Sequence, residues 1–300
     1  MNRKLISAVV AAAALLVQAA MSGAMADAQA TSHVDSMAAT VGSKVNVTGQ
    51  ASFSNFTKLV GEDPADALVP GIGTDIRNIK ISRVAPNGKI NFTLEIGDQP
   101  ATLNGMPETV AYYWDITVQN GESSSSYELW AARSAQWAAA GSTNPIFRRY
   151  VCVLDPTTGQ NTCGTAVNVT GKMADGVVEW QLNASQINAQ AGSVITGTAI
   201  EVSPTAAGAV WGVVRLDGSG ASQSEQFDVP GATVKLGIAP AGTPVENVVL
   251  DGVGSVNTST QTFSGALDKP AAGPGNYIVV AEACFGADNC ALSSTPLTVA

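Results

Sequence analysis

The chain has 300 residues, enough for one or two domains with a sizeable core, and only 13% of them are charged. Its net charge of −9 argues against a nucleic-acid partner and against attachment to anionic membranes. The single histidine, His33, excludes Ser–His–Asp and Cys–His catalysis and most zinc sites.

The first 26 residues predict export. Arg3 and Lys4 precede an apolar run from Leu5 to Ala20, and Ala24-Met25-Ala26 fits the small-x-small pattern of a cleavage site. Removal of this signal peptide takes away two positive charges and leaves a mature chain of −11. The apolar run is short for a permanent anchor, so we expect a secreted protein, extracellular or periplasmic, without membrane insertion.

The four cysteines fit an oxidising compartment. Each of the two pairs encloses a short segment, which predicts local disulfides between Cys152 and Cys163 and between Cys284 and Cys290. The alternative is four free buried thiols. A metal site is disfavoured, because the spacings are wrong and histidine partners are missing.

From the N-terminus onward, residues 27–42 lack periodicity and are expected to be flexible. The chain then alternates apolar and polar residues in many short segments with close turn signals, which is typical of a β-sandwich. These segments predict strands at 44–48, 53–60, 75–84, 90–96, 112–118, 127–130, 147–154, 166–170, 177–182, 194–202 and 211–216. The broken alternation between Ile76 and Ile79 indicates a β-bulge.

The stretch 111–130 forms the predicted centre of this sandwich. Tyr112, Trp114, Ile116 and Val118 share one face, and the strand resumes at Tyr127 after the entirely non-apolar residues 119–126, which we interpret as a loop. Because sequential strands usually pair, we expect strands 90–96, 112–118 and 127–130 to lie side by side.

A domain boundary is expected at Pro230-Gly231, where the pattern of apolar and polar residues changes. Residues 43–229 are thus predicted to form an antiparallel, jelly-roll-like β-sandwich. Residues 230–300 are predicted to form a separate small immunoglobulin-like β-sandwich, with strands within 232–240, 245–252, 261–267, 275–284 and 294–299. The expected fold class is therefore all-β throughout.

Three groups of residues are candidates for chemistry. Asp115, Glu128 and Glu179 lie on predicted strands and are either solvent-facing acids or the carboxylate pair of a glycosidase. The acidic cluster Asp63, Asp66 and Asp75 offers oxygen ligands of the kind that bind a structural calcium ion. Alternatively, these aspartates only cap turns at the entry to a strand. No other cofactor is indicated.

The third group is aromatic. Trp130 falls out of phase with Tyr127 and Leu129, and Trp137 lies in 131–140, which is either a short helix or a crossing loop. Exposed aromatic rings can stack on sugar rings, so Trp130, Trp137 and Tyr113 are the candidate ligand-binding residues. The alternative for both tryptophans is cover for an edge of the sandwich. Trp114 and Trp180 are expected in the core, and Trp211 is ambiguous.

Several segments resemble the carbohydrate-binding family 9-like, or DOMON-type, β-sandwich. They are Asp63-Pro64-Ala65-Asp66-Ala67, Asp75-Ile76, Ile90–Leu94, Tyr113-Trp114-Asp115, Val178-Glu179-Trp180, Ile187 and Ala191–Ile195, within about residues 60–220. In that family some members grip sugars between aromatic rings and bind structural calcium, and others are haem cytochromes with Met and His ligands. Here Met106 is present, but the sole histidine, His33, lies outside the matching region, which disfavours haem.

The leading hypothesis from these observations is a secreted, non-catalytic protein that binds a glycan or cell-wall polysaccharide. The second hypothesis is a structural or protein-interaction module of the cell envelope without a small ligand. The third is a glycosidase that uses paired carboxylates.

Overall fold

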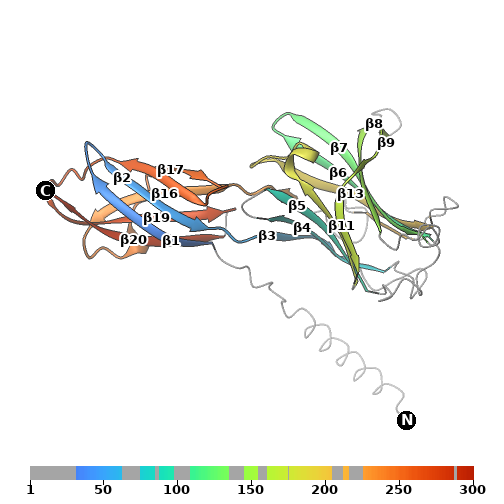
Figure 1. The fold of residues 1–300 in the computed structure, drawn as a ribbon, viewed down its shortest axis with the longest axis horizontal. Coiled ribbons are helices and arrows are strands. Elements are labelled where there is room, and N and C mark those ends of the chain that lie inside the picture. The colour runs from blue at the N-terminus through green and yellow to red at the C-terminus, as the bar shows by residue number, and fades with distance from the viewer. Residues whose placement is uncertain are drawn as a thin grey trace, which may run out of the picture.

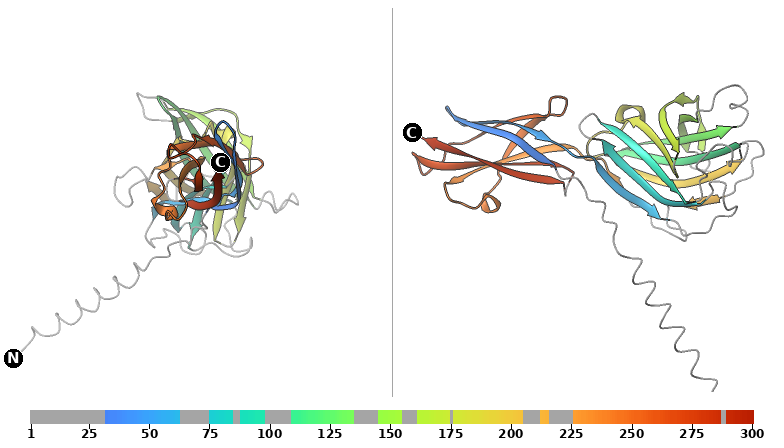
Figure 2. Two further views of the ribbon diagram at one scale, coloured as in Figure 1. Left: turned by 90° about the vertical axis from the view of Figure 1, so that its left-hand side faces the viewer. Right: turned by 60° about the horizontal axis from the view of Figure 1, so that its bottom comes forward.

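The computed structural model describes residues 32–62, 75–84, 88–97, 109–134, 145–154, 161–174, 176–204, 212–215, 226–286 and 289–300. The predicted signal peptide lies outside them. The described chain is almost entirely antiparallel β-strand and forms two sandwich lobes placed end to end (Figures 1 and 2). No helix within these ranges has the length and apolarity needed to cross a membrane.

One lobe combines the beginning and the end of the chain. Its sheet has seven strands in the order β1-β2-β18-β17-β16-β19-β20. The strands are β1 (His33–Val41), β2 (Val45–Ser52), β16 (Ala232–Pro240), β17 (Gly252–Asn257), β18 (Thr262–Leu267), β19 (Gly275–Phe285) and β20 (Cys290–Val299). We call it the terminal lobe.

The terminal lobe corrects the expected domain boundaries. Residues 33–41, expected to be flexible, form β1, and β2 pairs with β18 instead of joining the first sandwich. The reason is burial: Val45 and Val47 of β2 are fully buried in one core with Phe263 and Leu236. The sandwich of β3 to β15 is therefore inserted between β2 and β16, and residues 230–300 supply only part of the terminal lobe.

The strand expected within 245–252 is also corrected. Residues Val245–Asn247 form a 3-10 helix, η3, and the strand β17 begins afterwards at Gly252. The segment after η3 passes very close to Gly237 of β16. A Cβ on residue 237 would lie 2.3 Å from the carbonyl oxygen of Val249, so this close approach requires a glycine.

The inserted lobe packs a five-stranded sheet against an eight-stranded one. The five-stranded sheet has the order β11-β12-β5-β4-β3, and the other runs β10-β8-β7-β6-β13-β14 with β9 and β15 attached. The bounds are β3 (Phe56–Glu62), β4 (Ile76–Val84), β5 (Lys89–Ile96), β6 (Thr109–Asn120), β7 (Ser123–Ser134), β8 (Ile146–Leu154), β9 (Asn161–Cys163), β10 (Val167–Asn168), β11 (Thr170–Ala174), β12 (Val177–Asn183), β13 (Val194–Pro204), β14 (Gly212–Arg215) and β15 (Phe227–Asp228).

Large aromatic side chains join the two sheets of the inserted lobe. Trp114 of β6 meets Phe92 of β5 edge to face at 5.3 Å and Trp180 of β12 at 6.4 Å, and all three are fully buried. The expected core positions of Trp114 and Trp180 are confirmed. The expected pairing of β5 beside β6 is wrong, because the two strands face each other across the core from different sheets.

Two register shifts keep apolar residues on the inner face. The expected bulge in β4 is present between Ile76 and Asn78. A second shift, between Gly197 and Ala199 of β13, reverses the alternation, so that both Ile195 and Ile200 point into the core. Without it, residues five positions apart would face opposite sides of the sheet.

The β6–β7 hairpin is longer and its turn tighter than expected. The turn consists of Gly121 and Glu122 only, and Gly121 has φ +58°, a conformation that glycine adopts without strain. Most of the polar residues 119–126 therefore lie in strands, not in a loop. They are polar because this end of the hairpin is largely solvent-exposed.

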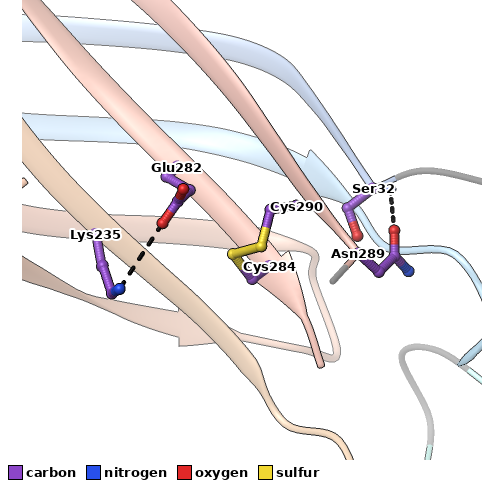
Figure 3. The surroundings of a disulfide bond; sticks show 6 residues. All are labelled: Ser32, Lys235, Glu282, Cys284, Asn289 and Cys290. Atoms are coloured by element: carbon purple, nitrogen blue, oxygen red, sulfur yellow. Dashed lines mark hydrogen bonds and ion pairs between the residues drawn. A yellow bond between two sulfur atoms is a disulfide. The ribbon is translucent and has the colours of Figure 1, made fainter. Parts of the chain in front are cut away.

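Both expected disulfides are confirmed, Cys152–Cys163 between β8 and β9 and Cys284–Cys290 between β19 and β20. Beside the second, Asn289 accepts a hydrogen bond from the backbone N–H of Ser32 at 2.6 Å (Figure 3). Its Nδ2 donates to the carbonyl of Ser54 at 3.5 Å. One buried amide thus links the start of the described chain to the segment that enters the inserted lobe.

Candidate functional site

Tyr113 and Trp130 are brought together on the outer face of the eight-stranded sheet. They are direct register partners on β6 and β7, on the face opposite Trp114 and Leu129. The small side chains of Ala111 and Ala132 pack beside them, and Tyr150 of β8 packs against the same cluster. We call this group the outer aromatic cluster.

The cluster is more enclosed than a stacking platform requires. Trp130 retains only 9% of its surface, and the guanidinium of Arg148 lies over its ring, 5.1 Å from the centroid. The burial of Trp130 favours the alternative stated for it, cover for an edge of the sandwich, because small neighbours and Arg148 pack against its ring. Tyr113 is half-buried, whereas Trp137 and Trp211 lie outside the residues whose side chains are described.

The candidate carboxylates divide between the two sheets. Asp115 and Glu128 are register partners on the outer face of the eight-stranded sheet, one row from Tyr113 and Trp130. Glu179 lies on β12 in the other sheet, where its carboxylate accepts hydrogen bonds from Gln181 at 2.6 Å and Thr93 at 3.4 Å. Glu179 therefore belongs to a polar network on its own sheet and does not join the other two acids.

The acidic cluster is represented in the described residues by Asp75 alone, because Asp63 and Asp66 lie outside them. Asp75 is 5% exposed, and its Oδ2 accepts from Arg77, with Nε at 2.7 Å and Nη2 at 2.6 Å. A carboxylate oxygen already held by a guanidinium is a poor calcium ligand. The observed role of Asp75 is thus an ion pair at the entry to β4.

A second group of possible metal ligands is found in the terminal lobe. Glu282, Cys284 and Cys290 approach one another there (Figure 3). Both sulfurs are joined in the disulfide, so neither is a thiolate. The carboxylate of Glu282 instead lies 3.9 Å from the ammonium of Lys235. This group does not form a metal site.

A polar cleft of about 410 Å³ opens in the inserted lobe where the chain crosses from one sheet to the other between β10 and β11. The lining residues are almost all uncharged hydrogen-bonding groups: Asn168, Thr170, Gln181, Asn183 and Gln186, with Val169 and the single charge of Lys89. We call it the carboxamide cleft. It was not anticipated from the sequence.

Hydrogen bonds within the protein orient two of the cleft amides. The Nε2 of Gln181 donates to Glu179, and the Oε1 of Gln186 accepts from the backbone N–H of Asn183 at 2.7 Å. Gln186 belongs to the 3-10 helix η2 (Ala184–Ile187), whose Ile187 is fully buried in the core. These bonds leave the carbonyl of Gln181 and the Nε2 of Gln186 for a ligand.

The polar network continues over the outer face of the five-stranded sheet to Glu95. Burial acts to raise the pKa of Glu95, but hydrogen bonds from Lys80 and Asn78 and the charge of Lys80 outweigh it, so the pKa lies below its usual value. Glu95 is thus a charged anchor of this face, held by Lys80 Nζ at 2.7 Å and Asn78 Nδ2 at 2.6 Å.

The amides of the cleft come from segments that are distant in the sequence. The alternation of β12 places Gln181 and Asn183 outward, but nothing in the sequence indicates that Asn168 lies beside them. No protein-family model, curated protein or solved structure matches the chain.

Proposed function

We propose that this is a secreted, non-catalytic binding protein that takes a neutral glycan or cell-wall polymer in the carboxamide cleft. The observation that carries the proposal is the lining of the cleft, which holds four carboxamides and one hydroxyl beside one charged residue. Each carboxamide offers two donors and one acceptor, which complements sugar hydroxyls because these both donate and accept. The cleft volume is also within the usual range for small-ligand sites.

Charge supports a neutral ligand over a highly anionic one. Strong anion sites use bidentate arginines or several cations, whereas Lys89 is the one cation among the described residues that line this cleft. Secretion is supported by the two disulfides and by the predicted signal peptide. The resemblance of residues 60–220 to sugar-binding sandwiches points to the same class of ligand.

The test begins with an array of neutral polysaccharides (glucans, mannans, galactans and xylans) and one acidic polysaccharide. The best ligand is then titrated calorimetrically into the mature protein and into the double variant Asn168→Ala/Gln181→Ala. We expect binding at least tenfold weaker in this variant, about 1.4 kcal/mol or more, with little change in the melting temperature.

Asn247→Ala is the matched control, since Asn247 is an exposed carboxamide of the terminal lobe. It should bind like the wild type. Equal polysaccharide affinity of the cleft variant and the wild type would show that the cleft is not the binding site. A wild-type protein that binds no polysaccharide would refute the glycan proposal and favour a protein-interaction module.

A further inference from the structure

The terminal lobe contains a larger groove, of about 590 Å³, that crosses four neighbouring strands. Three consecutive residues of each strand line it: 36–38 of β1, 48–50 of β2, 262–264 of β18 and 255–257 of β17. We call it the transverse groove. It lies in a different lobe from the carboxamide cleft and shares no residue with it.

Strand register gives the groove its shape. The central residues Met37, Gly49, Phe263 and Val256 form one row of partners across the sheet. Their inward direction follows from Phe263, which is buried in the core of this lobe, and from Met37 and Val256, which pack against that core. The outward residues on either side form two parallel rows: Ser36, Gln50, Thr262 and Asn257, and Ala38, Thr48, Ser264 and Ser255.

The two rows define an elongated channel. Four strands span about 14 Å across the sheet, and residues two positions apart on a strand are separated by about 7 Å. Seven of the eight outward residues are exposed, the exception being Thr262, which is half-buried. Their side chains are mostly short, so the channel stays open along its length.

The chemistry of the channel is uniform and neutral. Apart from Ala38, every outward residue carries a hydroxyl or a carboxamide, and none of the described residues that line the groove is charged. Two other strands of the same seven-stranded sheet differ, because Lys235 of β16 and Glu282 of β19 form an ion pair there. The neutral surface is therefore a local property of the residues of these four strands that line the groove.

We infer that the transverse groove is a second binding site, which takes an extended neutral polysaccharide chain across the strands. A peptide is a poorer fit for two reasons. Peptides that join sheets pair with a free strand edge, whereas β2, β18 and β17 are each paired on both sides and the groove runs perpendicular to them. Peptide grooves also need apolar pockets for side chains, and Ala38 is the one outward apolar residue here.

The test uses the full mature chain and the double variant Thr48→Val/Ser264→Ala. Both substitutions remove hydroxyls from the groove without adding bulk, and valine keeps the β-branched shape that suits a strand. Thr40→Val is the matched control, because Thr40 is exposed on β1 one row beyond the groove. Long and short chains of neutral glucan, mannan, galactan and xylan are titrated, and thermal melting checks folding.

We expect the groove variant to bind a long polysaccharide at least tenfold more weakly than Thr40→Val does. As a second variant, Ser255→Arg places a long side chain at an exposed position of the channel and should weaken binding similarly. The cleft variant Asn168→Ala/Gln181→Ala should still bind the long polysaccharide in the transverse groove.

Each site can fail separately. If only the cleft variant loses affinity, the groove is not a binding site and the second inference is overturned. If only the groove variants lose affinity, the cleft is excluded and the groove remains. Saturable binding of an extended peptide that competes at the groove, with no polysaccharide bound, would overturn the assigned ligand class.

Discussion

Phe56 and Phe227 pack against each other with their ring centroids 5.8 Å apart, where the chain enters and leaves the inserted lobe. Phe56 is the first residue of β3 and contacts the cores of both lobes, while Phe227 lies on β15 shortly before the return. A Cβ on Gly286 would lie 3.2 Å from Phe56 and 3.4 Å from Pro230, so both crossing segments meet the terminal lobe at one place.

This proximity predicts that the insertion can be removed. A chain in which a short Gly/Ser linker joins Asn55 to Pro230, with 56–229 deleted, keeps all seven strands of the terminal lobe. We expect it to fold, because domains inserted between neighbouring points leave their host intact. Cooperative thermal unfolding and dispersed amide resonances are the measurements.

Residues 231–300 alone are the control for this experiment. They lack β1 and β2, so the buried faces of Phe263 and Leu267 lose their cross-strand partners. We expect no cooperative transition from this fragment. A cooperative melt of 231–300 equal to that of the seven-strand chain would show that β1 and β2 are dispensable.

The second prediction concerns Trp130. Because its ring is covered by Arg148 and packs on Ala111 and Ala132, Trp130→Ala should lower the free energy of unfolding by about 2–4 kcal/mol, somewhat below a fully buried aromatic. Chemical denaturation measures the loss. Leu59→Ala, at a 37% exposed position, should cost far less. If the two variants cost the same, Trp130 is not a packing residue.

Trp114→Ala provides the upper reference for that series. Trp114 is fully buried and contacts both Phe92 and Trp180, so its loss should cost about 3–5 kcal/mol. The ordering Trp114, then Trp130, then Leu59 is the expected result. A smaller cost for Trp114 than for Trp130 would contradict the core assignment.

Sequence patterns predicted burial well and connectivity poorly. Alternation correctly identified Trp114 and Trp180 as core and Trp130 as outward, because the two-residue period is a local property of each strand. It did not predict that β5 and β6 belong to different sheets or that β2 pairs with β18, since such pairings join segments far apart in the sequence. The Cys152–Cys163 and Cys284–Cys290 bonds were predictable because both are local.

The candidate sites illustrate the same limit. The predicted stacking residues are neighbours, as Tyr113 and Trp130 show, but the cover over Trp130 comes partly from Arg148 on another strand. The transverse groove depends on the register between β2 and β18, so no window of sequence contains it.

The third prediction concerns pH and Glu95. Its folded pKa lies below the unfolded value, so its contribution to stability is present above the unfolded pKa of about 4.3 and is lost as pH falls through the folded pKa. Glu95→Gln should therefore destabilise the protein at pH 7 by less than about 1 kcal/mol, since the pair with Lys80 is partly exposed. The difference from the wild type should shrink below pH 4.

Urea denaturation at several pH values measures this difference. Glu122→Gln, at the exposed β6–β7 turn, serves as the control for replacing a carboxylate by an amide. A gap between Glu95→Gln and the wild type that stays constant down to pH 2.5 would mean that the carboxylate charge does not contribute.

The fourth prediction concerns Asn289, which is 2% exposed. Asn289→Ala leaves the buried N–H of Ser32 without its acceptor, which should cost about 1–3 kcal/mol. Hydrogen exchange of β1 should accelerate more than that of β6. Asn276→Ala is the comparison, since Asn276 is exposed on β19. Unaltered exchange in β1 would show that Asn289 does not hold the first strand.

The insertion also determines the order in which the strands of the two lobes can pair during folding. During synthesis β2 emerges long before β18, and no local partner is available to cover its other edge after β1 has paired with it. The inserted lobe, by contrast, is contiguous in the chain and can close by itself. Pairings between distant segments form slowly because a long loop must first close. The β1–β2 hairpin is therefore an exposed strand edge for most of folding, and the edge of β2 is the place where intermolecular pairing would begin.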